Sequence, residues 1–319
     1  MQTYIKHTVA AAANGYILMF FSEHMFWARV RPDDSLKNWI IGWIVYSLAG
    51  YVVLALIPLA RIRTIWPLFL AGAVFGWLTE GVFVQTTYEN LPLSVSWTGL
   101  AWHALLSVGV GWFGFRVALK RSFMATARLA ALVGGLYGLW AITWWAEPGT
   151  TAASTIDFAA FVWTTTALFT LAHAAFEWAA PVLSRPNPVL AALVAVTFAL
   201  YFILVAVPAA PIALAVLPLL LGLAALGLWG YRRQACADGA LFPSDSIRPG
   251  RYLAVAFLPL AASAVYALAE ALGLRWHTNW VVYLVTTPLG FALFGYALVK
   301  GLRRDPGRAV ASLVVKEML

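Results

Sequence analysis

The chain has 319 residues, of which 62% are hydrophobic and only 11% are charged. Soluble domains carry about 25% charged residues, so this chain has too little polar surface to be a soluble protein. Its mean hydropathy is +0.82, and its apolar runs repeatedly reach the length that crosses a bilayer. The only cysteine, Cys236, excludes an internal disulfide and any multi-cysteine metal site.

The pattern predicts an all-α, polytopic integral membrane helical bundle with about ten transmembrane helices. The apolar runs lack the alternation of a membrane β-barrel, and helices are the other structure that satisfies the backbone in lipid. One membrane domain is expected over 1–319, with 301–319 as a cytoplasmic tail. Between 189 and 231 three prolines interrupt one apolar region, which predicts either a hairpin or a broken helix. The expected spans are 9–27, 38–60, 65–84, 98–118, 128–146, 157–180, 189–207, 211–231, 251–272 and 279–300.

The basic residues predict the orientation of these spans. If the spans alternate, 17 of the 21 lysines and arginines fall on one side, which the positive-inside rule makes cytoplasmic. Both termini are then cytoplasmic. Basic loops facing anionic lipid also account for the net charge of +8 without nucleic acid. We expect a multi-pass protein of a cell membrane, a prokaryotic inner membrane in particular.

Two ionisable residues flank one loop, Glu80 before it and His103 after it. Each lies about five residues inside an apolar run, so both sit roughly 7–8 Å below the same membrane surface. On neighbouring antiparallel helices, a carboxylate and an imidazole at equal depth can meet. Charge inside a bilayer is costly, so the pair is a candidate functional site. The loop between them, 85–97, is expected to be an ordinary interfacial loop or a lid over the pair.

Three more ionisable residues map to the same side, namely Glu23 and His24 at the end of the first span and Glu270 in the ninth. Glu80, His103, Glu23 and His24 are therefore the candidate catalytic residues, acting as general acids and bases. An alternative is a divalent metal such as Zn²⁺ or Fe²⁺. The other alternative is that each group is hydrogen-bonded to a neighbouring helix and does no chemistry. The candidate metal ligands are Glu23, His24, Glu80, His103 and Glu270.

A second polar group lies on the sixth span, where Thr166, Thr170, His173 and Glu177 share one helix face. The spacing predicts a structural His173–Glu177 contact, with the inner end of a proton path or metal site as the alternative. No nucleophile elbow is present. Ser22 beside His24, and Ser107 one turn after His103, are the Ser–His neighbours in the sequence.

These observations favour an integral membrane enzyme that acts on an apolar or amphiphilic substrate, such as an isoprenoid, quinone or lipid, near the outer leaflet. A proton-coupled secondary transporter and a non-catalytic scaffold or accessory subunit are the alternatives. The expected partners are membrane lipid and an apolar small molecule, not nucleic acid. No phosphate-binding loop is present, so ATP-driven work by this chain alone is not expected.

Overall fold

The computed structural model describes residues 2–29, 35–150, 152–180, 185–234, 241–242 and 245–303. The regular secondary structure of these residues is helical throughout, and nine segments are long and apolar enough to cross a membrane. The predicted all-α, polytopic membrane bundle is therefore confirmed for the described part of the chain. Most of the cytoplasmic tail that the sequence predicts, 304–319, lies outside the described residues.

The helices follow one another as nearly continuous spans, some of which change from α-helix to π- or 3₁₀-helix, marked η. In chain order they are α1 (Gln2–Met19) with η1 (Phe20–Met25), α2 (Leu36–Leu59), α3 (Ile65–Leu78) with η2 (Thr79–Phe83), η3 (Thr86–Tyr88), η4 (Val95–Gly114) with α4 (Phe115–Arg121), α5 (Phe123–Ala141) with η5 (Ile142–Trp145), α6 (Thr155–Ala179), α7 (Pro188–Tyr201) with η7 (Phe202–Ala206) and α8 (Val207–Ala209), α9 (Ala213–Gln234), η8 (Pro249–Ala256) with α10 (Phe257–Ala271), and α11 (Thr278–Leu302).

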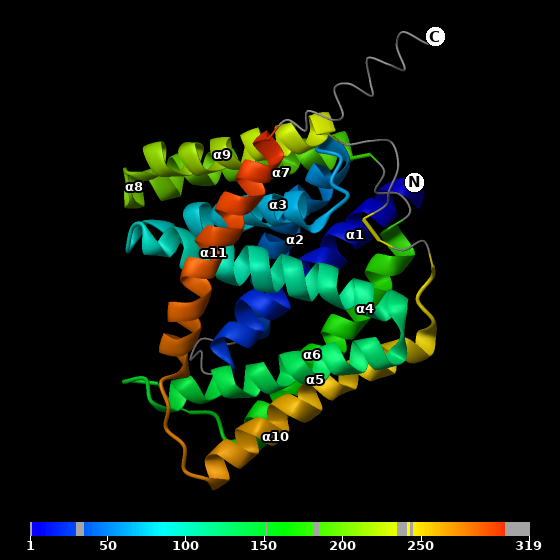
Figure 1. The fold of residues 1–319 in the computed structure, drawn as a ribbon, viewed down its shortest axis with the longest axis vertical. Coiled ribbons are helices and arrows are strands. Elements are labelled where there is room, and N and C mark those ends of the chain that lie inside the picture. The colour runs from blue at the N-terminus through cyan, green and yellow to red at the C-terminus, as the bar shows by residue number, and fades with distance from the viewer. Residues whose placement is uncertain are drawn as a thin grey trace.

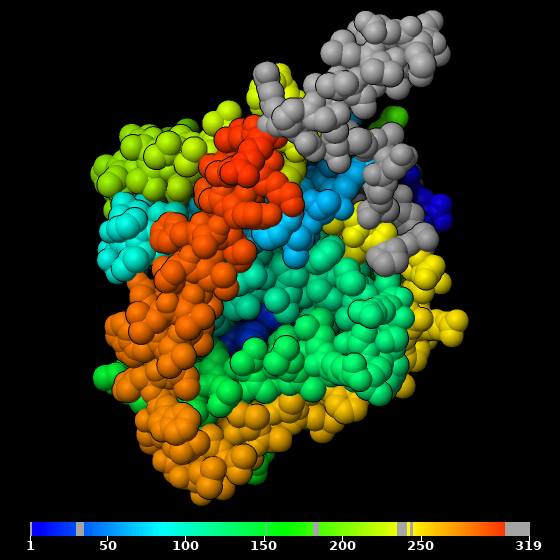
Figure 2. Space-filling model, in the orientation of Figure 1, coloured from blue at the N-terminus to red at the C-terminus, as the bar shows by residue number. Residues whose placement is uncertain are grey.

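The first helix, α1 continued by η1, lies in the centre of the bundle. Residues 13–22 are all buried, and α1 packs against α2, α6 and η4. Figure 2 shows it almost hidden beneath the other helices. It is the one expected span that is not among the nine segments apolar enough to cross a membrane. A helix surrounded by protein does not need an apolar surface, so this helix can carry Asn14, Ser22, Glu23 and His24.

The region between 189 and 231 forms two helices rather than one broken helix. The first runs from Pro188 to Ala209, and α9 begins at Ala213 after a connection that contains Pro211. Proline has no backbone N–H and fixes its own φ, so a connection is favoured there. Pro218 lies inside α9.

The helices α3 and η4 approach each other closely near the candidate site. A Cβ atom added to Gly76 would lie 2.3 Å from the carbonyl oxygen of Gly99, so the two backbones touch at these glycines. The indole of Trp77 donates a 2.9 Å hydrogen bond to the Val95 carbonyl and fixes their register. Figure 1 shows α11 running across the other helices, and it packs on α3, η4 and α9.

Candidate functional site

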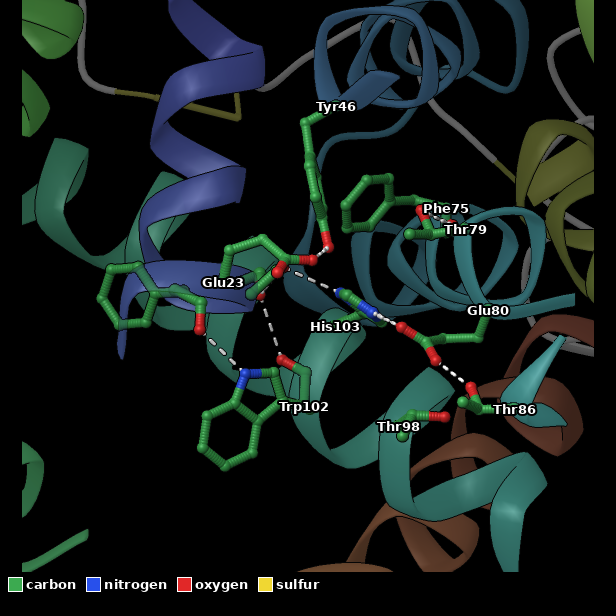
Figure 3. A network of polar contacts seen from close by, with 12 residues as sticks. Glu23, Tyr46, Phe75, Thr79, Glu80, Thr86, Thr98, Trp102 and His103 are labelled. Carbon is green, nitrogen blue, oxygen red and sulfur yellow. Dashed lines mark hydrogen bonds and ion pairs between the residues drawn. The ribbon is translucent and has the colours of Figure 1, made fainter. Parts of the chain in front are cut away.

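Glu80 and His103 meet in the interior, as their equal depth predicts. The Nε2 atom of His103 lies 2.6 Å from Oε1 of Glu80 (Figure 3). His103 is 2% exposed and Glu80 is 8% exposed. The contact follows from the glycine approach of α3 and η4, because Glu80 lies one turn after Gly76 and His103 one turn after Gly99.

Ser22 of η1 completes a line of three groups through the imidazole. Its Oγ lies 2.9 Å from Nδ1 of His103 and 2.9 Å from Oγ of Ser107. When Glu80 is ionised and the imidazole is neutral, Nε2 carries the proton and Nδ1 accepts one from the Ser22 hydroxyl. The sequence places Ser22 beside His24, but the structure pairs it with His103, 81 residues away.

The loop after η2 folds back on Glu80. Thr86 donates a hydrogen bond to the second carboxylate oxygen of Glu80, and Tyr88 donates a 2.8 Å bond to the carbonyl of Gly81. Burial raises the pKa of Tyr88 to about 12, so the phenol stays a neutral donor. From the sequence, this loop is expected to be either an ordinary interfacial loop or a lid. In the structure its first residues contact Glu80 and Gly81, and both carboxylate oxygens of Glu80 are engaged.

Glu23 lies next to this line of groups and faces a cavity of about 330 Å³. Its Oε1 accepts a 2.9 Å hydrogen bond from the buried Tyr46 hydroxyl, which also lies beside the Ser22 hydroxyl. Glu80 and His103 are not among the residues that line this cavity; they lie behind Ser22 and Tyr46. The residues that line it are Met19, Glu23, His24, Trp27, Arg29, Asn38, Trp39, Ile41, Gly42, Val45, Tyr46, Thr79, Phe83, Val84 and Phe161.

His24 lines the same cavity in an aromatic setting. Its ring lies 4.5 Å from that of Trp39 and 5.6 Å from that of Phe161, measured between ring centroids. Its Nε2 atom is buried and has no hydrogen-bond partner among the described residues. A buried polar atom without a partner is unusual in a folded protein.

A shallower groove of about 420 Å³ adjoins the cavity and shares Arg29, Trp39 and Phe161 with it. Its other lining residues come from the start of α2 and from α6, including Leu36 and Ala160. The cavity and the groove therefore lie side by side between α2 and α6.

The candidate residues lie on π-helical segments. Ser22, Glu23 and His24 are in η1, Glu80 is in η2 and His103 is in η4. A π-helical turn shifts the following side chains around the helix axis, and such turns occur frequently at functional sites. Three of the four π-helical segments in the described residues thus contribute to one polar group.

Glu270 does not join this network. It is exposed near the end of α10, where Thr155 donates a hydrogen bond to it. Within the described residues, no three side chains of His, Cys, Asp or Glu lie close enough together to hold a metal ion. Glu80 and His103 are hydrogen-bonded to each other, and each has a second partner, Thr86 for Glu80 and Ser22 for His103. Both carboxylate oxygens and both imidazole nitrogens therefore already have a hydrogen-bond partner.

The contact expected between His173 and Glu177 is not present. Glu177 instead pairs with Arg116 at 2.6 Å and with Lys120 at 2.8 Å. His173 is buried and lies 3.2 Å from the carbonyl oxygen of Gly111. Side chains at i, i+4 can meet, but a carboxylate gains more from two cations on the neighbouring helix than from one imidazole.

Several residues of these networks are not apparent from the sequence. Tyr46 and Thr86 carry no motif, and Arg116 and Lys120 resemble ordinary basic residues at a membrane surface, although each is only 6% exposed. The i, i+4 spacing of Arg116 and Lys120 places both cations on one helix face, and this spacing could have predicted that they share one carboxylate partner.

Comparisons of the chain with models of known protein families, with curated proteins and with solved structures found no match. The function must therefore be inferred from the geometry and chemistry of the site.

Proposed function

We propose that this protein is an integral membrane enzyme that performs acid–base chemistry on an apolar or amphiphilic small molecule, such as an isoprenoid, quinone or lipid. The observation that carries the proposal is the position of Glu23. Its carboxylate lines a cavity with mostly apolar walls and is bonded to Tyr46, directly beside the Ser22–His103–Glu80 line. Ionisable groups placed together at a cavity inside a bilayer are characteristic of function rather than of packing.

The four candidate residues take different roles in this proposal. Glu23 exchanges a proton with the substrate, because it is the carboxylate on the cavity wall. His103 and Glu80 form the buried pair that supplies or stores the proton, with Ser22 between His103 and the cavity wall. His24 offers its unpartnered nitrogen to a polar group of the substrate. Proton transfer by such a positioned group contributes about 10²–10⁴-fold to a rate.

The surroundings of the cavity support a substrate that comes from the membrane. The groove between α2 and α6 adjoins the cavity, and in this proposal it is the side from which the substrate enters. Ile41, Val45 and Phe161 give the wall an apolar character that suits a hydrocarbon or ring system. With both termini in the cytoplasm, as the basic residues predict, this access lies near the outer leaflet.

The transporter alternative has less support. A proton path would join His103 to His173 and Glu177, but an aromatic layer separates the two groups. Phe21 lies in η1, and its ring centroid is 5.8 Å from that of Phe169, which in turn lies 4.7 Å from that of His173. The hydrogen bonds of the described residues do not cross this layer.

The proposed function can be tested by comparing the lipids of cells and by filling the cavity. Lipid mass spectrometry of cells with and without the protein identifies the molecules that it consumes or produces. Gly42 lies on the cavity wall, and among the described residues a Cβ atom added there comes within 4 Å of only the Met19 sulfur, at 3.4 Å. We therefore use Gly42→Phe to fill the cavity. We expect Gly42→Phe and Glu23→Gln to abolish these changes.

Two matched variants control this experiment. Gly295→Phe places the same side chain on α11, where nothing lies within 4 Å of an added Cβ, and Glu89→Gln removes an exposed carboxylate. Both should behave like the wild type. A wild-type lipid profile in folded Gly42→Phe and Glu23→Gln would refute the proposed function.

A further inference from the structure

Ser22, His103 and Glu80 form the arrangement of a nucleophile, a base and an orienting acid. The hydroxyl lies 2.9 Å from one imidazole nitrogen and the carboxylate lies 2.6 Å from the other. Nucleophilic serine is recognised by this geometry and not by sequence order. Resting on the proposed function, we propose that Ser22 is a nucleophile and that the reaction is acyl transfer from an ester of an amphiphilic lipid.

The surroundings hold the three groups in place. Thr86 engages the second oxygen of Glu80, and the ring of Phe75 packs edge-on against the imidazole with centroids 5.3 Å apart. The Ser107 hydroxyl lies 2.9 Å from that of Ser22 and also hydrogen-bonds to the Trp102 carbonyl at 3.2 Å. The proton of the Ser22 hydroxyl can be donated to His103. In the serine-protease triad the serine faces Nε2 of the histidine and the acid faces Nδ1. In this protein the serine faces Nδ1 and the acid faces Nε2. Either imidazole nitrogen can take up a proton, so the proton of the serine hydroxyl can be transferred in both arrangements.

The step balances with groups already present. The Ser22 oxygen attacks the ester carbonyl carbon and its proton moves to Nδ1 of His103, while Glu80 stabilises the imidazolium through Nε2–H. The bond from the carbonyl carbon to the alcohol oxygen breaks, and the alcohol takes the proton from Nδ1. Water or a second lipid alcohol then attacks the acyl–Ser22 ester. Its proton passes through the same nitrogen back to the Ser22 oxygen, and no atom is oxidised or reduced.

The position of Ser22 behind the cavity wall sets a condition for this reaction. Ser22 is 6% exposed and does not itself line the cavity. It lies behind Glu23 and Tyr46, which are hydrogen-bonded to each other in the cavity wall. The hydrogen bond between these two side chains must open for a carbonyl to reach the serine. Tyr46 then remains beside Ser22 as an O–H donor for the carbonyl oxygen, where negative charge develops.

An alkyl fluorophosphonate, which forms a stable bond with nucleophilic serines, tests the proposal on the purified full chain. Peptide mass spectrometry should find the adduct on Ser22. Ser22→Ala should abolish it, and His103→Ala should slow labelling by at least about 10²-fold. Ser263→Ala is the matched control, because the Ser263 hydroxyl is buried on α10 without a partner.

The outcomes separate this proposal from the proposed function. A wild-type chain without an adduct on Ser22, or an adduct rate that His103→Ala leaves unchanged, overturns the nucleophile. If Ser22→Ala keeps the lipid changes that Glu23→Gln abolishes, the nucleophile is refuted and the acid–base enzyme stands. If Ser22→Ala does not fold, Ser22→Cys preserves the volume of the side chain. In a Cys236→Ser background its thiol should react with an alkyl iodoacetamide at a rate that depends on His103, and a rate independent of His103 overturns the proposal.

Discussion

His103 Nε2 lies 2.6 Å from Glu80 Oε1, on two helices whose backbones touch at Gly76 and Gly99. The glycines and the hydrogen-bonded Glu80–His103 pair form one unit, because each glycine precedes its ionisable residue by one helical turn. The close approach brings the two groups together and excludes lipid from between them. A polar contact of this kind stabilises the interior only while both partners are present, since either group alone would be buried without a partner.

We first predict that Glu80→Gln folds and loses activity. The amide has the shape of the carboxylate but cannot stabilise a positive charge on His103. Turnover of the lipid identified in cells should fall about 10²–10⁴-fold. The variant should elute as a monodisperse particle in detergent with a melting temperature close to that of Glu89→Gln. Full turnover by Glu80→Gln would show that the carboxylate charge is not used.

Gly76→Ala should disrupt the site from a distance. Its added methyl group would lie 2.3 Å from the Gly99 carbonyl, so α3 and η4 must separate. Overpacking of this kind costs about 1–3 kcal/mol of unfolding free energy, and the Glu80–His103 contact should lengthen. Gly135→Ala is the control, because nothing lies within 4 Å of its added Cβ. Unfolding titrations in mixed detergent should show a loss for Gly76→Ala only; equal stabilities would mean that the helices are not in contact there.

Glu177→Gln should destabilise the protein through Arg116 and Lys120. Both cations are buried, and the change leaves them without their counter-charge. Breaking a buried ion pair costs about 3–5 kcal/mol, and we expect the lower end because the Glu177 side chain is 22% exposed. Combining Glu177→Gln with Lys120→Met should recover part of the loss, with a coupling of about 1–3 kcal/mol in a double-mutant cycle. Strictly additive effects would argue against the pairing.

His173→Ala should lower stability without changing chemistry. The imidazole fills buried space beside Phe169 and Phe115 and contacts the Gly111 carbonyl. Truncation leaves a cavity and removes the contact with the Gly111 carbonyl, at a cost of about 2–4 kcal/mol. Thermal denaturation should show the loss, whereas turnover per folded molecule should remain at the wild-type level. Normal stability with abolished turnover would place His173 in the mechanism instead.

Both termini should lie in the cytoplasm. Seventeen of the 21 lysines and arginines fall on that side when the expected spans alternate. A fluorescent protein fused after Leu319 should therefore fluoresce in the cytoplasm, and alkaline phosphatase at the same position should be inactive. Active alkaline phosphatase would reverse the assignment and move the cavity to the inner leaflet.

The sequence alone determined the class of protein and most of its helices. An apolar run must be long enough to cross the hydrocarbon, and its backbone must be satisfied within the helix, so composition and length are sufficient to predict a span. The same reasoning singled out Glu80 and His103. Two ionisable side chains at equal depth on adjacent antiparallel helices have few other polar partners inside an apolar bundle, so they are expected to contact each other.

The tertiary structure decided which partner each polar group takes. In a bilayer, the surfaces that face lipid and those that face protein are both apolar, so the sequence does not reveal which helices are neighbours or how each is rotated. The position of α1 in the centre brings Ser22 to His103 rather than to His24, and the rotation of α6 brings Glu177 to Arg116 rather than to His173. These contacts depend on lateral packing between segments far apart in the chain, and only the folded structure supplies it.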